Sequence, residues 1–144
     1  MSPGIAAFKG IIAHPWAYPA LEVVHIIGIA LLVGNLIAFE LRVWGVGAAL
    51  PVPALARLSL SVAVAGFCLA AASGSLMFAS QAAELLSNRA FVVKMGLVLA
   101  AGGNAAWFHA RGGLHKLDAI ARAQTVMSVG LWILVIICGR WIAY

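Results

Sequence analysis

Several side chains that can ligate a metal or carry a charge lie within long apolar stretches of this sequence. They are His25, Met77, Lys94, Met95, Cys138 and Arg140. Imidazole and thioether groups are axial ligands of haem iron, and imidazole, thioether and thiolate together suit copper. Ionisable groups are costly in apolar surroundings, so each is a candidate for function. Whether they act together depends on the elements that position them.

The composition is that of an integral membrane protein. Of the 144 residues, 65% are hydrophobic and 9% are charged, whereas soluble domains carry about 25% charged residues. The formal charge of +5 comes from basic residues that stand singly between apolar runs. A nucleic-acid site would gather them on one face. We therefore expect lipids, and no nucleic acid, as partners of a single domain.

Four apolar runs are long enough to cross a membrane, because about 20 apolar residues span a hydrocarbon core of about 30 Å. We predict spans over residues 20–44, 58–80, 91–109 and 123–143. Each should be helical, because a backbone in lipid must satisfy its own hydrogen bonds. Short connections make neighbouring helices antiparallel. The prediction is an all-α, up-down-up-down four-helix bundle formed by residues 20–144.

Residues 1–19 differ from the four spans, because prolines interrupt them. The prolines are Pro3, Pro15 and Pro19. The segment is too broken to span, and Trp16 and Tyr18 suit the headgroup region of a bilayer. We predict an interfacial segment there. The first residues lack the basic region of a signal peptide, so we expect the first span to direct insertion.

The distribution of basic residues indicates an orientation. We call the membrane side of the N-terminus side A and the opposite side B. Side B carries Arg42, Arg57, Arg111, Lys116 and Arg122, and side A carries Lys9, Arg89, Lys94 and Arg140. Because cytoplasmic loops are enriched in basic residues, the small excess on side B predicts a cytoplasmic side B and an N-terminus outside.

Antiparallel helices would bring the candidate ligands into one layer just inside side A. A helix rises 1.5 Å per residue, so His25 early in the first span and Lys94 early in the third lie at similar depths. Spans two and four return to this depth with the remaining candidates. His25 would be the axial ligand of a b-type haem, with Lys94, Met77 or Met95 as second ligand. Lys94 or Arg140 would otherwise neutralise a haem propionate.

The same layer also suits copper, through His25, Met77, Met95 and Cys138. A bis-histidine haem would need His14 from the interfacial segment. His109 cannot serve, because it lies at the opposite end of a parallel span, about 20–25 Å from His25. We consider His109 a candidate hydrogen-bond donor to a quinone.

Two further groups of residues have structural interpretations. Near side B, we expect Glu40 to pair with loop charges and Asn104 to form an interhelical hydrogen bond. Small residues recur every four positions in spans one to three, which allows close helix packing within the chain or between copies. They are Ala30, Gly34 and Ala38; Gly66, Ala70 and Gly74; and Gly96 and Ala100. A third hypothesis is therefore a cofactor-free structural subunit that forms homo-oligomers.

Three stretches carry a family resemblance. They are His25–Gly34 followed by Glu40-Leu41-Arg42, Ala90–Met95 leading to Asn104 and His109, and Gly139–Tyr144. Together they resemble a family of small bacterial four-span membrane proteins over most of the chain after Trp16. More distantly, the chain is similar to the superfamily of copper-resistance protein D and the four-span, haem-containing bacterial protoporphyrinogen oxidase.

This resemblance implies haem- or copper-linked redox chemistry in a bacterial inner membrane, with a quinone or a periplasmic protein as partner. In the oxidase, a histidine early in span one and a lysine early in span three are functionally important, and they match His25 and Lys94. An arginine that closes its first span matches Arg42. The resemblance carries over a fold and a haem-like layer but no reaction, because one fold serves many functions.

Overall fold

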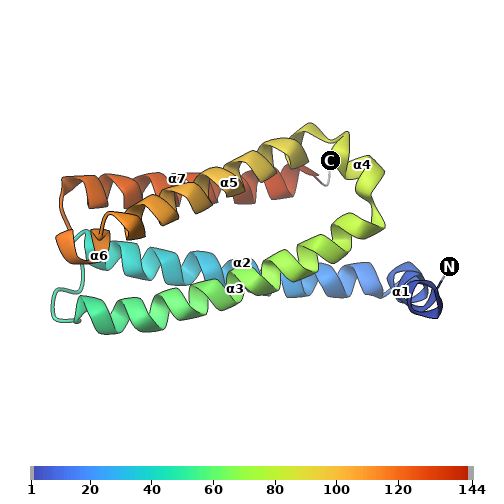
Figure 1. Cartoon of the computed structure of the whole chain (residues 1–144), viewed down its shortest axis with the longest axis horizontal. Coiled ribbons are helices and arrows are strands. Elements are labelled where there is room, and N and C mark those ends of the chain that lie inside the picture. Colours follow the sequence, from blue (N-terminus) through green and yellow to red (C-terminus); the bar gives the residue numbers. More distant parts are fainter. Residues whose placement is uncertain (1, 143–144) are drawn as a thin grey trace.

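The chain is a bundle of helices joined by short connections (Figure 1). The computed structural model describes residues 2–142, all of whose regular elements are helical. The helices are α1 (Pro3–Ala13), α2 (Ala17–Val43), α3 (Val52–Ser80), α4 (Ala82–Leu86), α5 (Arg89–Ala110), α6 (Gly113–Lys116) and α7 (Ala119–Ile142). Four of them, α2, α3, α5 and α7, are long and apolar enough to cross a membrane. The prediction of four long apolar helices is therefore confirmed.

All four long helices begin earlier than their predicted spans. Helix α2 starts at Ala17 rather than residue 20, and α3 starts at Val52 rather than residue 58. Pro19, which we had treated as a break, and Pro53 lie in the first turns of these helices. Proline fits there because the first backbone N–H groups have no partner within the helix. The last span reaches Ile142, and its predicted end at Ala143 falls outside the described residues.

The long helices form two antiparallel hairpins, α2–α3 and α5–α7, with α1 and the last turn of α7 at side A (Figure 1). Helices α2 and α7 contact each other and join the hairpins. At side A, the rings of Phe78 in α3 and Phe91 in α5 stack with centroids 5.5 Å apart. At side B, Phe39 and Phe108 pack edge to face, 6.2 Å apart, in a core with Val43 and Ala121. The up-down-up-down bundle is confirmed.

Helices α2 and α3 make backbone contact at two glycines. A Cβ atom added to Gly28 would lie 2.7 Å from the Ala70 nitrogen and 2.7 Å from the Gly66 oxygen. One added to Gly66 would lie 2.6 Å from the Gly28 oxygen. Only glycine permits this approach, which supplies the close packing that stabilises helix pairs in lipid. The strip of small residues predicted in span two is therefore a packing surface within the chain.

The strip predicted in span one does not pack within the chain. Ala30, Gly34 and Ala38 are exposed, and a Cβ on Gly34 would meet nothing within 4 Å. The packing face of α2 instead carries Gly28 and Leu32, because those residues point toward α3. The strip in span three is exposed too, at Gly96 and Ala100. These outward strips are free to contact lipid or another copy.

Helix α1 lies at the side-A end of the bundle, outside its core. The Ser2 hydroxyl accepts a hydrogen bond from the Ile5 N–H at 3.4 Å and caps the helix. None of the α1 residues is buried, and the helix is seen almost end-on in Figure 1, so it runs across the bundle axis. Its 11 residues are too few to span a bilayer. A position in the membrane interface remains a prediction.

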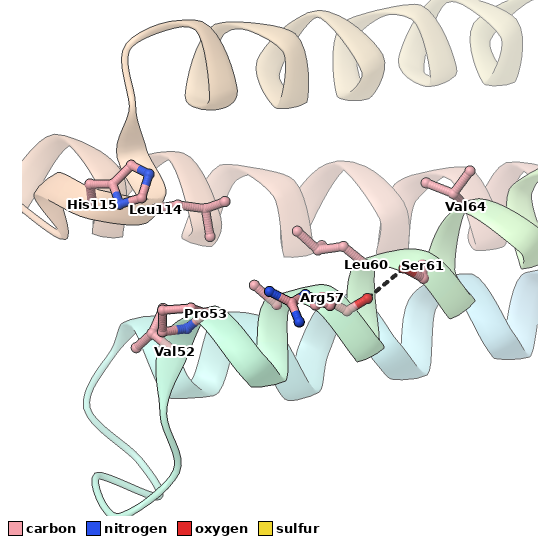
Figure 2. Close-up of a pocket in the computed structure, with 9 residues that line it drawn as sticks. Val52, Pro53, Arg57, Leu60, Ser61, Val64, Leu114 and His115 are labelled. Carbon is pink, nitrogen blue, oxygen red and sulfur yellow. Dashed lines mark hydrogen bonds between the residues drawn. The ribbon is translucent and has the colours of Figure 1, made fainter.

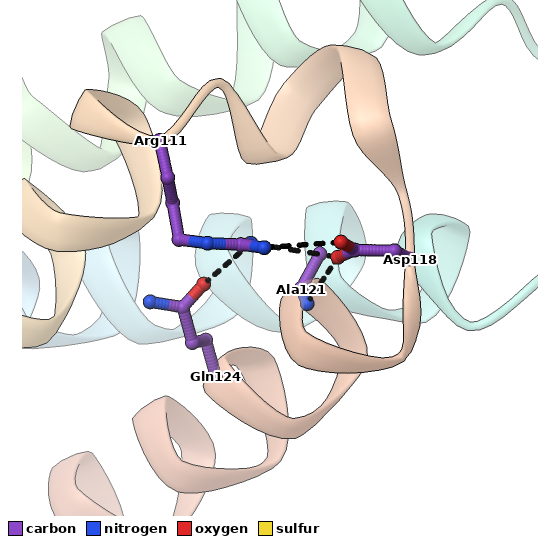
Figure 3. A network of polar contacts seen from close by, with 4 residues as sticks. All are labelled: Arg111, Asp118, Ala121 and Gln124. Atoms are coloured by element: carbon purple, nitrogen blue, oxygen red, sulfur yellow. Dashed lines mark hydrogen bonds and ion pairs between the residues drawn. The ribbon is translucent and has the colours of Figure 1, made fainter.

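An ion pair closes the connection between α5 and α7 at side B (Figure 3). An Arg111 guanidinium nitrogen lies 3.0 Å from a carboxylate oxygen of Asp118. The other Asp118 oxygen accepts a hydrogen bond from the Ala121 N–H at 2.9 Å, so Asp118 caps α7. The hydrogen bond from Arg111, followed by that from Ala121, holds the pKa of Asp118 below its usual value.

Replacing Asp118 with asparagine should make the stability of the protein less sensitive to acid. A depressed carboxyl pKa stabilises the fold above the unfolded-state pKa of about 3.9, and this contribution is lost as pH falls through the folded-state value. We therefore expect Asp118→Asn to melt slightly below the wild type at pH 7, with the difference vanishing in acid. Thermal unfolding in detergent across this range measures it. Asparagine still caps a helix, so a pH-independent difference would contradict the assignment.

Candidate functional site

His25 is held in a fixed orientation between α2 and α3. Its Nδ1 atom lies 2.9 Å from the Ala70 carbonyl oxygen and 3.2 Å from the Ser73 hydroxyl. A carbonyl oxygen only accepts hydrogen bonds, so Nδ1 carries the proton and donates it. The Ser73 hydroxyl donates to the Leu69 carbonyl at 2.8 Å, which leaves it able to accept from His25. This tautomer leaves the lone pair on Nε2, which makes no hydrogen bond to any of residues 2–142.

The α3 surface beneath the imidazole is flat because residue 74 is glycine. A Cβ atom on Gly74 would lie 3.3 Å from His25 Cε1 and 3.5 Å from Nδ1. The ring therefore packs directly on the α3 backbone, one turn beyond Ala70. We infer that Gly74, which the sequence pattern had marked only as a packing residue, makes room for the histidine.

The Lys94 side chain of α5 lies near α7, at the same level of the bundle as His25. Its ammonium group is within electrostatic range of His25 and of the Cys138 thiol. A Cβ on Gly139 would lie 3.6 Å from Lys94 Nζ, so the amine points toward α7. His25, Lys94 and Cys138 thus share one layer near side A, although they come from three helices.

The remaining candidates of this layer have different surroundings. Met77 is half-buried and lies four residues after Ser73, on the face of α3 that holds His25. Met95 is 38% exposed, and Arg140 is also exposed near the end of α7. Met77 is therefore the methionine that helix geometry places closer to the histidine.

The two other histidines considered as ligands or quinone partners, His14 and His109, lie apart from His25. His14 is exposed, and its Nδ1 accepts a hydrogen bond from the Trp16 N–H at 3.3 Å. His109 is exposed in the last turn of α5, and its ring packs edge to face on Phe108, 5.3 Å away. Within residues 2–142 no hydrogen bond or ring contact joins either of them to His25, and a bis-histidine haem that uses His14 stays a prediction.

The donor set of this layer is one histidine with sulfur and amine neighbours. Within residues 2–142, no group of three or more His, Cys, Asp or Glu side chains is arranged to hold a metal ion. Cys138 is half-buried, and the other cysteine, Cys68, is exposed; both are free thiols. A zinc-like cluster is therefore absent from the described part of the chain, whereas single-imidazole ligation with a lysine or thioether partner is geometrically open.

The side-B residues behave partly as predicted. Asn104 does form an interhelical hydrogen bond, from its Nδ2 to the Gln124 carbonyl oxygen at 2.8 Å. Glu40 does not pair with loop charges, so that prediction is wrong. It is 3% exposed, and its carboxyl group instead lies near the Ser128 hydroxyl of α7. Arg42 donates to the Leu50 carbonyl oxygen at 2.8 Å and so closes the first loop.

A groove opens between α3 and α6 near side B (Figure 2). It has a volume of about 650 Å³ and is lined mainly by apolar side chains such as Leu60, Val64 and Leu114. Its polar lining residues are Arg57, Ser61 and His115. Because it faces the side-B half of α3, it is separate from the histidine layer. An apolar groove on a membrane helix is a surface suited to lipid chains.

Sequence reasoning placed His25 and Lys94 at one level but missed what orients the histidine. The Ala70 carbonyl and the Ser73 hydroxyl were not anticipated, since no side-chain pattern identifies a backbone acceptor. Ser73 followed by Gly74 in a charge-free span was the available signal. Comparison of the chain with known protein families, with curated proteins and with solved structures found no match.

Proposed function

We propose that this protein is a membrane redox protein that binds one b-type haem near side A and takes part in electron transfer. His25 is the axial ligand in this proposal, through Nε2. The observation that supports it most directly is the hydrogen bond from His25 Nδ1 to the Ala70 carbonyl oxygen, 2.9 Å long.

That hydrogen bond is the arrangement that metal-binding histidines use. Such a histidine almost always donates its other ring N–H to a carbonyl or carboxylate, which fixes the tautomer and makes the ligating nitrogen more basic. Here the donor is Nδ1, and Nε2 keeps its lone pair. The contact with Gly74 restricts ring rotation further.

Lys94 has two possible roles in this proposal. As a cation on the same level as His25, it would neutralise a haem propionate; as a neutral amine, it would be the second axial ligand. Met77 is the thioether alternative for that position, and Arg140, exposed close to side A, suits a propionate at the membrane surface. When bound, haem would supply one-electron chemistry, and the apolar surroundings and the axial ligands would set its potential.

Side A is the predicted outer side of a bacterial inner membrane. A haem there would lie nearer to a periplasmic partner than to the cytoplasm. We therefore propose a periplasmic redox protein or a membrane quinone as the electron partner.

Copper handling is the alternative that one observation favours. The Cys138 thiol lies within electrostatic range of Lys94, which itself is near His25. Imidazole, thiolate and the Met77 thioether would form a soft ligand set for copper. Met95, the fourth copper candidate, is 38% exposed. A copper site therefore depends on His25, Met77 and Cys138 together, whereas the haem site with lysine depends on neither sulfur.

A cofactor-free structural role is the third possibility. The outward strips at Gly34 and Gly96 have open space around them, so a second copy would be able to approach closely there. In this case His25 would contribute only to packing between α2 and α3.

An optical spectrum of the detergent-purified protein, oxidised and then reduced with dithionite, tests the haem proposal. We expect the reduced α-band of a b-type haem with about one iron per one or two chains. Iron and copper should be counted on the same sample, from cells supplied with a haem precursor. A featureless spectrum without iron would contradict the proposal. Bound copper would then favour the alternative, and neither metal would favour the structural role.

A further inference from the structure

A carboxylic acid is buried in the side-B half of the bundle. Glu40 on α2 is 3% exposed, and its Oε2 atom has no hydrogen-bond partner among the described residues. Its carboxyl group interacts with the Ser128 hydroxyl of α7. Fifteen residues separate Glu40 from His25, which places it about 22 Å farther along the helix axis. It belongs to a different site from the histidine layer.

Two more buried polar atoms lack partners in the same layer. They are Asn104 Oδ1 on α5 and Gln124 Nε2 on α7, in residues that are 7% and 2% exposed. The Asn104 amide donates to the Gln124 main-chain oxygen, so these residues are adjacent. Ser128 lies one turn after Gln124, on the same face of α7.

The alignment of α2 against α7 places the Glu40 carboxyl group near the side-chain amides of Asn104 and Gln124. The Trp44 indole N–H donates to the Thr125 hydroxyl at 2.6 Å. One turn closer to the membrane centre, Glu40 meets Ser128. The two helices are antiparallel, so both contacts fit one alignment. The unpartnered atoms of Glu40, Asn104 and Gln124 are thus gathered where α2, α5 and α7 meet.

No basic side chain neutralises Glu40. On the neighbouring helices and loops, the exposed basic residues are Arg57, His109, His115, Lys116 and Arg122. Arg42 donates to main-chain oxygens, and Arg111 pairs with Asp118. Glu40 makes no ion pair with any of residues 2–142. An ionised carboxylate buried without a partner is strongly disfavoured and takes up a proton instead. Burial and neighbours together therefore indicate a neutral carboxyl group.

We propose that Glu40 is a membrane-embedded proton-binding site that holds a water molecule together with Asn104 and Gln124. The protonated Glu40 donates its O–H to the water, and Gln124 Nε2 donates an N–H to it. The water in turn donates to Asn104 Oδ1. Buried waters typically make about three such bonds to otherwise unpaired polar groups, so one water would satisfy all three atoms.

A polar chain connects this site with the side-B surface (Figure 3). The Gln124 side-chain oxygen accepts a hydrogen bond from an Arg111 nitrogen at 3.4 Å. Arg111 pairs with Asp118, whose side chain is 41% exposed. Gln124 is therefore shared between the buried layer and a solvent-facing ion pair. This chain ties the buried site to the side-B surface, and the site is independent of any haem at side A.

Infrared spectroscopy of the purified full-length protein tests the proposal. We expect a carbonyl stretch of a protonated carboxylic acid at pH 7, which shifts in D₂O and is lost in Glu40→Gln. The matched control is Glu84→Gln, since Glu84 is exposed and ionised carboxylates do not absorb there; it should keep the band. Absence of the band from the wild type, or its survival in Glu40→Gln, would overturn the proposal.

A second variant tests the water independently of Glu40. In Asn104→Leu the water loses its acceptor, so we expect the Glu40 carbonyl band to remain but to shift in frequency and to exchange with D₂O at a different rate. The comparison of Asn104→Leu with the wild type also tests the proposal if Glu40→Gln does not fold. An unchanged band in Asn104→Leu would contradict the shared water, and its conversion to an ionised carboxylate would contradict a burial-driven proton.

Discussion

Replacing His25 with alanine should abolish the haem absorbance of the purified protein and its bound iron. The imidazole is the one ligand that α3 holds in a defined tautomer, through the Ala70 carbonyl oxygen at 2.9 Å. Alanine offers no donor to the metal and no hydrogen bond to α3. Reduced-minus-oxidised spectra and iron content, measured against the wild type expressed in parallel, report the loss.

His109→Ala is the matched control for this experiment. His109 is exposed at the far end of α5 and contacts Phe108 rather than the His25 layer, so this variant should keep the full haem band. Retention of haem in His25→Ala with loss in His109→Ala would contradict our assignment of the ligand. Under the copper alternative, His25→Ala would lower copper content with no haem band to lose. In a cofactor-free protein it would change only stability, by about 1–2 kcal/mol.

Replacing Gly28 with alanine should destabilise the bundle by about 1–3 kcal/mol, the cost typical of overpacking. The new Cβ would lie 2.7 Å from both the Ala70 nitrogen and the Gly66 oxygen. These are backbone atoms, which cannot rotate away as a side chain does, so α2 and α3 would have to separate. Thermal unfolding in detergent measures the change.

Gly34→Ala is the matched control, because it adds the same methyl group to the same helix where nothing lies within 4 Å. It should be neutral or stabilising, by up to about 1 kcal/mol from helix propensity. Equal effects of the two substitutions would contradict the close approach at Gly28. If the haem proposal holds, Gly28→Ala should also weaken haem binding, since Ala70 is the hydrogen-bond acceptor of His25.

The sequence alone determined the architecture of this protein. Four long apolar runs and a low content of charge predicted four spans, and short connections predicted their antiparallel order. Both were confirmed, because span length and backbone satisfaction in lipid are local requirements. The boundaries shifted where Pro19 and Pro53 entered first turns. The depth of a residue in the bundle follows from its position along its own helix. The sequence could therefore place His25 and Lys94 at one level.

Which faces of the helices meet was decided only by the tertiary structure. In a soluble protein the apolar face marks the core, but a helix in lipid is apolar all around, and hydrophobicity does not drive its packing. The pattern therefore suggested Ala30, Gly34 and Ala38 as a packing strip, while α2 in fact packs through Gly28. The same ambiguity hid the backbone acceptor of His25. For the same reason the burial of Glu40 could not be predicted. A carboxylate near a helix end is expected to be exposed, and only the packing of the neighbouring helices buries it.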